Sequence, residues 1–491
     1  MAPSRRAGDL QCAAIALALA GAGAAPLLAA EAAATGAATD SAPAEAPADD
    51  VDRLRQRLKV LEDLVTKLQA DLELLRGQSG AGGVPPATSI KDLEKKIDAL
   101  TQEIARLRQA EAPPSEETGV NGLDPSASKV YRVSRGLVMG GYGSALYERF
   151  THSRDDDTPS TEVNRTDLAE AFLNLGYRFD DRFLFNTSLG IEHALVEDGS
   201  TSGEAAVEFA YIDYKANRYL GARGGLLLVP LGWLNELHNP AGYLGARRPE
   251  IEQRIIPTTW REVGAGVYGD AGPVTWRAYL LTGPDAAGFT AEDGIREGRQ
   301  QGSEARAGDL GLTARVDYRP LPQRAFGDLV LGAATFTGDT GQDRPGFPPG
   351  RLTLWDLHGQ YDWRGLRLRA LRVQGILSDA GEISLAIDPT GATVIAERTQ
   401  GWYAEIGYDT MEFLKKPEQK LIAFCRYERL HPQEKVAPGF APDPENRLTA
   451  KTCGLSYDPI PNLVIKLDAQ NFDNEAHTAT DQVNLGLGWA F

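Results

Sequence analysis

The sequence predicts an all-β transmembrane barrel of about 16 antiparallel strands, preceded by an N-terminal α-helical coiled coil. Three observations support this fold: an early heptad pattern of leucines, a period of two in the apolar residues after residue 136, and connections that alternate between long and short. Beyond residue 35, no window of about 18 uninterrupted apolar residues could form a membrane-spanning helix. Any membrane crossing is therefore expected to be made by strands.

Charge and composition exclude several other classes of protein. The 51 Lys and Arg against 68 Asp and Glu give a formal net charge of -17, which disfavours non-specific binding to nucleic acid. Three cysteines and six histidines are too few and too scattered for a zinc scaffold, and no cofactor is expected. Residues 264–269 match a G-x-G-x-x-G pattern, but no helical pattern follows, so we expect a glycine-rich strand and no nucleotide binding. We also expect no enzymatic activity, because the six histidines are too dispersed to suggest a Ser-His-acid site.

Residues 1–30 have the features of a secretory signal peptide. Arg5 and Arg6 precede an apolar run that ends in small residues at 28–30, a plausible cleavage site. Residues 31–50 are rich in Ala, Pro and acidic side chains, which cannot build a core. We expect them to form a disordered spacer.

Residues 51–108 carry two coiled-coil segments. Apolar residues recur in steps of three and four from Val51 to Leu75, and again from Ile90 to Leu107 after a Gly- and Pro-rich break. The narrow apolar seam suits self-association of helices. Its residue types favour a dimer, whereas the barrel that follows favours a trimer. Residues 109–135 are expected to form a linker.

Within residues 136–491, polar and apolar side chains alternate as in strands with one apolar face. In the last strand, Val483 and Leu485 fall on one side, and Gln482 and Asn484 on the other. The predicted strands are 136–150, 166–179, 183–197, 204–215, 219–231, 261–269, 273–283, 309–319, 326–337, 351–362, 366–378, 398–410, 419–431, 447–457, 462–473 and 481–491.

The connections after odd-numbered strands are mostly long, and those after even-numbered strands are mostly short. This is the pattern of outer-membrane barrels, which have long external loops and short periplasmic turns. It places both ends of the barrel in the periplasm, together with the coiled coil. The charged face of the strands would surround a wet lumen, and the apolar face would meet lipid. A soluble β-sandwich or a β-helix is the alternative fold.

Short motifs within the predicted barrel resemble those of bacterial porins. The terminal Phe491 on an alternating strand looks like the recognition signal of outer-membrane barrels. The residues VMGGYG at 138–143 and LVPLG at 228–232 resemble the phosphate-selective porin O and P type superfamily, with a looser match at 252–254. The resemblance implies an outer-membrane diffusion channel. The longest loop lacks the clustered lysines that phosphate selectivity would suggest.

The longest connection, residues 232–260, is expected to fold into the barrel and narrow its pore. It carries charges of both signs, and its apolar residues would be unusual on a loop in water. Facing charges in such a constriction sort solutes by size and charge. The residues predicted to form it are Arg247, Arg248, Glu250, Glu252 and Arg254. The alternative is a surface loop packed on a neighbouring subunit.

Charged residues on the polar faces of the strands are expected to line the pore wall. They are Arg277, Arg315, Arg367, Arg369, Arg372, Lys466 and Asp468. The three arginines of strand 366–378 would all face inward only with a β-bulge near Ala370. They would form a basic track, or pair with lumen acids such as Glu405.

The mature chain would keep two cysteines, Cys425 and Cys453. They lie symmetrically about residue 439, the centre of the predicted connection 432–446, so a regular hairpin places them opposite each other on one face. Opposed residues are within disulfide range, whereas a slip of one residue would separate them. The alternative is two free thiols that face lipid.

These features predict a porin of the bacterial outer membrane with its coiled coil in the periplasm. Small hydrophilic solutes, with anionic solutes among the candidates, would diffuse passively through the pore. The expected partners are outer-membrane lipid, these solutes and further copies of the chain in a homotrimer. The alternative is a structural barrel that tethers the outer membrane to the cell wall through the coiled coil.

Overall fold

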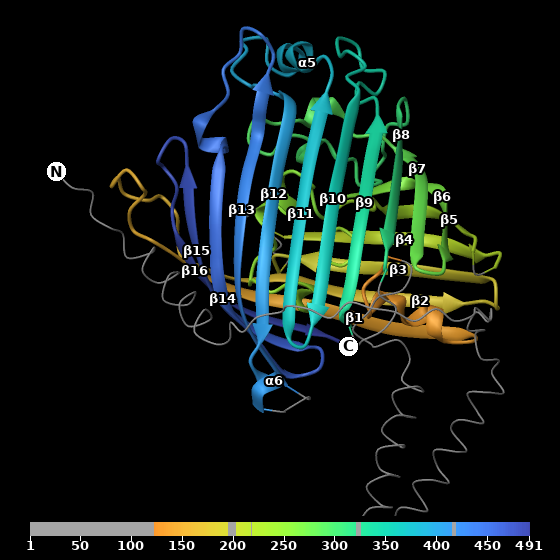
Figure 1. Ribbon diagram of the computed structural model, residues 1–491. Helices are drawn as coiled ribbons and strands as arrows, with labels where there is room; N and C mark the ends of the chain where they lie inside the picture. Colours follow the sequence, from red (N-terminus) through yellow and green to blue (C-terminus); the bar gives the residue numbers. More distant parts are fainter. Residues whose placement is uncertain (1–121, 195–202, 218, 321–325, 415–418) are drawn as a thin grey trace, which may run out of the picture. The chain divides into compact units, whose positions relative to one another are not determined.

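Sixteen antiparallel strands close into one barrel in the computed structural model, which describes residues 122–194, 203–217, 219–320, 326–414 and 419–491 (Figure 1). Each strand pairs with its neighbours in sequence, and β1 closes the sheet against β16. The strands are β1 (Gly136–Phe150), β2 (Arg165–Arg178), β3 (Phe183–Glu192), β4 (Glu204–Lys215), β5 (Gly221–Leu228), β6 (Arg261–Ala271), β7 (Val274–Thr282), β8 (Leu310–Tyr318), β9 (Asp328–Gly338), β10 (Leu352–Trp363), β11 (Leu366–Leu377), β12 (Ala396–Asp409), β13 (Lys420–Val436), β14 (Leu448–Ile460), β15 (Leu463–Asn474) and β16 (Gln482–Ala490).

The predicted number, order and direction of the strands are confirmed. Most bounds agree closely, although β3 ends earlier and β13 ends later than the sequence indicated. The predicted signal peptide, spacer and coiled coil lie outside the described residues, as does part of the predicted linker.

Short helices occupy several of the connections. They are η1 (Ala127–Arg132), η2 (Pro240–Gly242), α4 (Glu250–Arg254), η3 (Ala286–Gly288), η4 (Arg296–Gly298), α5 (Ala380–Ile387), α6 (Met411–Leu414) and η6 (Pro444–Asn446). None of the helices in the described ranges is long and apolar enough to cross a bilayer.

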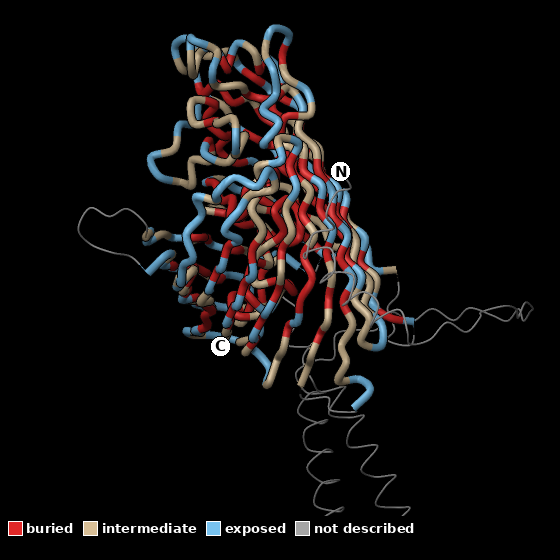
Figure 2. The backbone as a smooth tube through the Cα atoms, turned by 90° about the vertical axis from the view of Figure 1, so that its left-hand side faces the viewer, coloured by how far each residue is buried: buried red, intermediate tan, exposed pale blue. Residues whose placement is uncertain are grey.

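Burial alternates along the strands, as the period of two predicts (Figure 2). On β16, Leu485 is 48% exposed and its neighbour Asn484 is 0% exposed. On β8, Leu312 and Val316 are exposed, whereas Arg315 is buried. The outward face is therefore apolar, and the inward face carries many of the polar and charged side chains.

The interior also contains an apolar core, which the sequence did not lead us to expect. Phe336 of β9 and Val373 of β11 face inward and are buried. They belong to one hydrophobic cluster with Trp233 and Ile251 from the connection between β5 and β6. A sixteen-stranded barrel is too wide for its own side chains to fill, so part of this connection fills the space.

Residues 122–132, which were predicted to belong to the linker, pack against the inner faces of β2 and β3. Asn174 donates a hydrogen bond to Oγ of Ser126 at 2.7 Å, and Asn186 donates one to the carbonyl of Ala127 at 2.9 Å. The linker prediction is wrong for this stretch, because inward-facing asparagines bind its polar groups.

The barrel closes between Gly141 of β1 and Phe491. The N–H of Gly141 donates to the carbonyl of Phe491 at 3.0 Å, and the N–H of Phe491 donates to the carbonyl of Gly141 at 2.8 Å. The Phe491 side chain is 57% exposed on the outside. Phe491 thus extends the pairing of β1 with β16 by one residue.

Deleting Phe491 should lower the yield of folded barrel, because it removes both hydrogen bonds and an outward aromatic ring. Heat-modifiable migration on a gel measures the folded fraction. Phe491→Trp, which keeps the seam and an aromatic ring, is the matched control and should fold as well as the parent chain. Equal yields from the deletion and the parent would contradict the prediction.

Cys425 and Cys453 form a disulfide between β13 and β14. They are directly opposed in the register, with Cα atoms 4.1 Å apart and a sequence separation of 28. Both lie on the outward face, in alternation with Phe424 and Thr452, which are fully buried inside. The symmetric pairing and the bond that it permits are confirmed.

Reducing this disulfide should destabilise the barrel by about 3.6 kcal/mol, the loop-closure value for 28 residues. Urea unfolding in detergent, with and without reductant, measures the difference. A Cys425→Ser, Cys453→Ser double variant should show no response to reductant. Labelling of two free thiols in the denatured, unreduced chain would show that the bond does not form.

Candidate functional site

The connection between β5 and β6, residues 229–260, lies inside the barrel, and we call it the inner segment. One side chain, Asn235, joins its two ends. The Nδ2 amide donates to the carbonyls of Val229 and Trp260 at 2.6 and 2.8 Å, and Oδ1 accepts the N–H of Trp260 at 2.6 Å. These hydrogen bonds hold the two ends of the segment together, where the chain enters the lumen after β5 and returns to the start of β6.

Glu252 holds the middle of the inner segment together. The N–H groups of Trp233 and Leu234 donate to its Oε2 at 2.8 and 2.6 Å, and Tyr403 of β12 donates to its Oε1 at 2.7 Å. The residue is 0% exposed. Burial raises the pKa of Glu252, and this effect outweighs the hydrogen bonds, which lower it. Glu252 therefore sets the shape of the segment and does not contact open water.

One side of the inner segment is apolar and packs on inward-facing side chains of β9–β12. Trp260 lies against Phe336, with ring centroids 4.7 Å apart. Ile251 and Ile255 belong to the same cluster as Leu371 of β11. Burial of this much apolar surface stabilises the folded segment, because each buried aliphatic side chain contributes about 1.5–3 kcal/mol.

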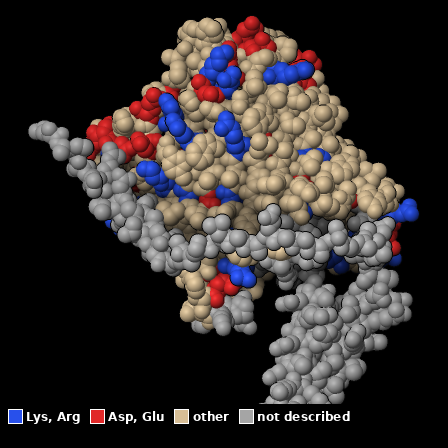
Figure 3. All heavy atoms as spheres, viewed as in Figure 1, with Lys and Arg blue, Asp and Glu red and all other residues tan. Residues whose placement is uncertain are grey.

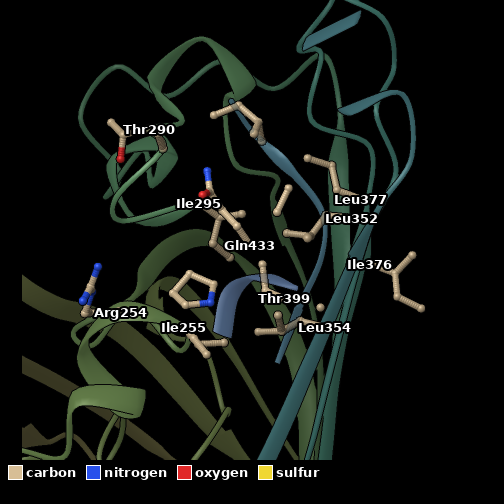
Figure 4. A pocket seen from close by; sticks show the side chains of 16 residues that line it. Arg254, Ile255, Thr290, Ile295, Leu352, Leu354, Ile376, Leu377, Thr399 and Gln433 are labelled. Atoms are coloured by element: carbon tan, nitrogen blue, oxygen red, sulfur yellow. The ribbon is translucent and has the colours of Figure 1, made fainter. Parts of the chain in front are cut away.

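A small cavity remains on this apolar side (Figure 4). The space open to the centre of a water molecule is about 30 Å³, which exceeds the roughly 10–15 Å³ needed to hold one water. Ile255, Leu352 and Leu354 contribute to its largely apolar lining. The cavity can therefore hold ordered water between the inner segment and this part of the wall.

Buried ion pairs attach the beginning of the inner segment to β7 and β8. Glu236 pairs with Arg277 and lies 3.8 Å from Arg315. Arg315 also donates to the carbonyl of Gly232 and pairs with Asp317 at 2.8 Å. Each charge has a partner of opposite sign, so the network avoids the large desolvation cost of an isolated buried charge.

The opposite side of the inner segment is polar and faces β1 and β2. Arg247 donates to Glu148 of β1 at 2.5 Å, and Arg248 donates to Glu170 of β2 at 2.7 Å. The side chains of Arg247 and Arg248 are 25% and 17% exposed. These two cations therefore remain in contact with water inside the barrel.

Backbone groups of the same side meet β15. Lys466 donates to the carbonyls of Tyr243 and Gly245 at 2.6 and 2.9 Å. The N–H of Ala246 donates to Oδ2 of Asp468 at 2.5 Å. Lys466 and Asp468 face inward, but they hold the inner segment and do not line an empty wall.

Arg254 lies apart from the other arginines of the inner segment. Its Nη2 donates to the carbonyl of Glu292 at 3.1 Å and to Oδ1 of Asn446 at 3.3 Å. Glu292 belongs to the connection between β7 and β8, and Asn446 precedes β14. The guanidinium of Arg254 thus joins the inner segment to two other connections.

The same β7–β8 connection covers the end of the inner segment. Arg296 Nη1 donates to the carbonyls of Gln253 and Thr258 at 2.6 and 3.0 Å. Arg299 Nη1 donates to the carbonyl of Pro257 at 2.9 Å. Burial lowers the pKa of Arg299 to about 10. These guanidiniums replace water at the backbone carbonyls and fix the return of the chain to β6.

The five residues predicted to form the constriction therefore separate. Arg247, Arg248 and Glu250 share the polar side, where Glu250 lies 3.8 Å from Arg247. Glu252 is enclosed by the segment's own backbone, and Arg254 binds other connections. Sequence spacing alone could not separate them, because the inner segment changes direction several times within a few residues.

Most residues predicted for the pore wall face inward. Arg277, Arg315, Lys466 and Asp468 contact the inner segment as described above. Arg369 donates to the carbonyl of Gly242 at 3.0 Å. Arg367 donates to Asp362 of β10 at 2.7 Å, near the 364–365 turn.

The prediction that Arg372 faces inward is wrong. β11 pairs with β10 and β12 in a continuous register, without the predicted bulge at Ala370. Leu371 and Val373 are therefore inward and buried, and Arg372 is outward and exposed. The prediction relied on a bulge that would turn Leu371 and Val373 towards lipid, whereas both pack in one cluster with apolar residues of the inner segment.

Sequence reasoning missed the wall acids that pair with the inner segment. Glu148 and Glu170 lie on the polar side of the alternation in their strands, which was the available signal. Glu208 was also missed, and its Oε2 lies 2.9 Å from Nε2 of the buried His238. Burial lowers the pKa of His238, but the Glu208 carboxylate raises it by more. In the described ranges, no group of three His, Cys, Asp or Glu residues is placed to hold a metal ion.

Replacing Glu252 tests how the inner segment is held. The folded-state pKa of Glu252 lies above its ordinary value, so folding takes up a proton and stability falls as the pH rises through these two pKa values. Glu252→Gln should reduce this decline and keep the segment in place. Glu252→Leu leaves two buried N–H groups and the Tyr403 hydroxyl without an acceptor, at about 1–3 kcal/mol each.

Urea unfolding in detergent between pH 4 and pH 8 measures both effects. The matched control is Glu162→Gln, which removes one carboxylate from an exposed position. If Glu252→Leu were as stable as the parent chain, Glu252 would not hold the segment.

The comparisons with known proteins show a family. No protein-family model matches the chain. A protein of Aquifex aeolicus (strain VF5), described as an uncharacterized protein, is 35% identical over 377 residues, which are 75% of this chain and 83% of the relative. The chain belongs to the same family as this Aquifex aeolicus protein.

Solved structures with a similar fold include outer-membrane proteins. OmpF of Salmonella typhi, in complex with daunomycin, is 12% identical with a TM-score of 0.48, over 73% of this chain and 98% of OmpF. The anion-selective porin from Comamonas acidovorans is 10% identical with a TM-score of 0.45, over 72% and 99%. The channel DcaP of Acinetobacter baumannii is 11% identical with a TM-score of 0.43, over 72% and 97%.

Proposed function

We propose that the chain is an outer-membrane porin through which small hydrophilic solutes diffuse passively. The observation that carries the proposal is the asymmetry inside the barrel. The inner segment seals its apolar side against β9–β12, and it presents partly exposed cations to paired acids on its other side. An apolar exterior around such an interior suits a protein that crosses a membrane and contains a water-accessible path.

The proposed path runs between the polar side of the inner segment and the wall formed by β1 and β2, beside the partly exposed Arg247 and Arg248. On β15 and β16, which the inner segment contacts directly, the inward side chains Gln470, Gln482 and Asn484 are buried. Asn484 donates to Asp468 and Gln470, each at 2.8 Å. These buried side chains bond to one another and to Asp468, so the polar groups that a hydrated solute can meet are the partly exposed arginines beside β1 and β2.

Anionic solutes fit the proposed constriction better than cationic ones. Arg247 and Arg248 are 25% and 17% exposed, whereas the side chains of Glu148 and Glu170 are 3% and 7% exposed. A solute in the path therefore lies nearer to the guanidiniums than to the carboxylates. Electrostatic attraction in a narrow, partly desolvated site is several times stronger than in bulk water. Phosphate, which the porin resemblance implies, is one candidate within this class.

The proposal places the barrel in the bacterial outer membrane as a homotrimer, with the coiled coil in the periplasm. The second candidate function is a tether between outer membrane and cell wall. It is favoured by the two heptad segments within residues 51–108 and would leave conduction incidental. Conductance in planar bilayers separates the two functions, because unit current steps are expected only from a channel.

Neutralising Arg247 and Arg248 together, as Arg247→Gln and Arg248→Gln, should shift the reversal potential in a salt gradient towards cations. The exposed positive charges leave the path while the acids stay. The shift should shrink in concentrated salt, because the Debye length falls from about 8 Å at physiological salt to about 3 Å at 1 M. Arg254→Gln is the matched control and should leave selectivity unchanged, since its guanidinium binds Glu292 and Asn446.

Equal reversal potentials for the double variant and the parent at low salt would place the constriction elsewhere. A shift with Arg254→Gln as large as that of the double variant would contradict the division of the inner segment into two sides. Complete absence of current from the correctly folded parent chain would favour the tether.

A further inference from the structure

A group of basic side chains faces outward on β11, β13 and β14. Arg372 is paired with Trp402 of β12, and Trp402 is paired with Arg429 of β13. Lys451 of β14 is paired with Tyr427 of β13. We call Arg372, Arg429 and Lys451 the outer basic cluster. Figure 3, which looks at this face, shows Lys and Arg side chains separated by uncharged surface.

The outer basic cluster lies where the outward face changes from apolar to polar. On the side of the short 364–365 turn, the outward positions are apolar and exposed, as at Leu368, Ile406 and Leu455. On the side of the long connections, the next outward positions are Gln374 and Gln400, which are paired with each other. An apolar belt that ends in polar groups matches the edge of the hydrocarbon layer.

Aromatic rings lie between the basic side chains. The rings of Trp402 and Tyr427 have centroids 5.4 Å apart and are 39% and 38% exposed. Trp and Tyr concentrate at the level of lipid headgroups, because they combine an apolar ring with a polar atom. The rings therefore place the outer basic cluster at headgroup level and not within the hydrocarbon.

Arg372 and Arg429 can act on one anion. Neighbouring strands are about 4.8 Å apart, so the two Cα atoms, two strands apart, are separated by about 10 Å, and long side chains can converge over Trp402. Among the described residues, neither guanidinium lies within ion-pair distance of a carboxylate. Arg372 makes a hydrogen bond of 3.4 Å to Gln400. The guanidinium fork suits the paired oxygens of a phosphate.

Two of the three strands that carry this cluster, β13 and β14, are covalently joined. Cys425 and Cys453 are paired two residues below Tyr427 and Lys451 and on the same outward face. The disulfide therefore fixes the register of β13 and β14 next to the cluster, so binding an anion there requires little further ordering of the strands.

We propose that the outer basic cluster binds the phosphate group of an anionic lipid in the outer leaflet. The inference rests on the proposed placement of the barrel in the outer membrane, but not on conduction. Exposed guanidiniums at headgroup level without a carboxylate partner complement a lipid phosphate, whose acyl chains can lie along the apolar belt below. The rings of Trp402 and Tyr427 provide a surface for the remainder of the headgroup.

Native mass spectrometry of the delipidated, full-length protein in detergent tests this proposal. The probes are lipid A with two phosphates and the same lipid after removal of both phosphates. The parent chain should bind the phosphorylated form at least about tenfold more tightly. The double variant Arg372→Gln, Arg429→Gln should lose about tenfold in affinity for that form and keep its weak binding of the dephosphorylated form.

Arg149→Gln is the matched control. Arg149 is an outward, exposed arginine on β1 that is paired with Val483, away from the outer basic cluster. The Arg149→Gln variant should bind both lipids with the affinities of the parent chain. Equal affinity of the parent for the two lipids, or equal losses in the double variant and in Arg149→Gln, would overturn the proposal. A double variant that loses oligomers in lipid-free detergent but keeps its lipid affinity would assign the cluster to a second copy of the chain.

Conductance is measured on the same samples, so the two proposals can fail separately. A barrel that conducts no current but binds the phosphorylated lipid more tightly would support the lipid site and contradict the channel. A barrel that conducts current but binds both lipids equally would support the channel and contradict the lipid site. Should the double variant fold poorly, the comparison of the two lipids on the parent chain still decides the question.

Discussion

The structure depends on one constraint, which is that each charge buried inside the barrel requires a partner. Sixteen strands enclose more space than their inward side chains can fill, and the inner segment occupies much of it. Its polar backbone and its acids would be costly to bury alone. Arg277 and Arg315 pair with Glu236, and Lys466 binds carbonyls of the segment. The strands thus carry inward charges for two reasons. Some of these charges bind the inner segment, and others face water.

This constraint gives the interior two unlike halves. On the side of β9–β12, apolar residues of the inner segment meet apolar residues of the wall beside one small cavity. On the side of β1 and β2, ion pairs keep Arg247 and Arg248 partly exposed. The proposed path for solutes is therefore displaced towards β1 and β2. The electrostatic preference of this path is set by the more exposed partner of each ion pair, which is the arginine.

The strand positions could be predicted because each depends on local alternation. The exposed Leu485 and buried Asn484 follow directly from the period of two. The pairing of Cys425 with Cys453 also follows from it, since a regular hairpin has a fixed centre. Arg372 could not be placed correctly by assuming that the charged residues of a strand face inward. Its direction depends on Leu371, whose inward partners come from a distant part of the chain.

The interior partners depend on contacts between residues that are far apart in sequence. Glu148 and Arg247 are separated by 99 residues, and Tyr403 and Glu252 by 151. No short motif records such pairs. The sequence does show which positions face inward, so it indicated that charged residues would meet there. It could not indicate which of them would meet, or that Glu252 would bind the backbone of its own segment.

The central claim is that the inner segment governs passage through the barrel. The most direct measurement is the single-channel conductance of a chain in which residues 233–258 are replaced by a short Gly- and Ser-rich linker. Heat-modifiable migration first establishes that this chain forms a barrel. The account predicts a several-fold higher conductance and a loss of charge selectivity, because both the apolar seal and the exposed arginines are removed. An unchanged conductance and selectivity in the folded barrel would contradict it.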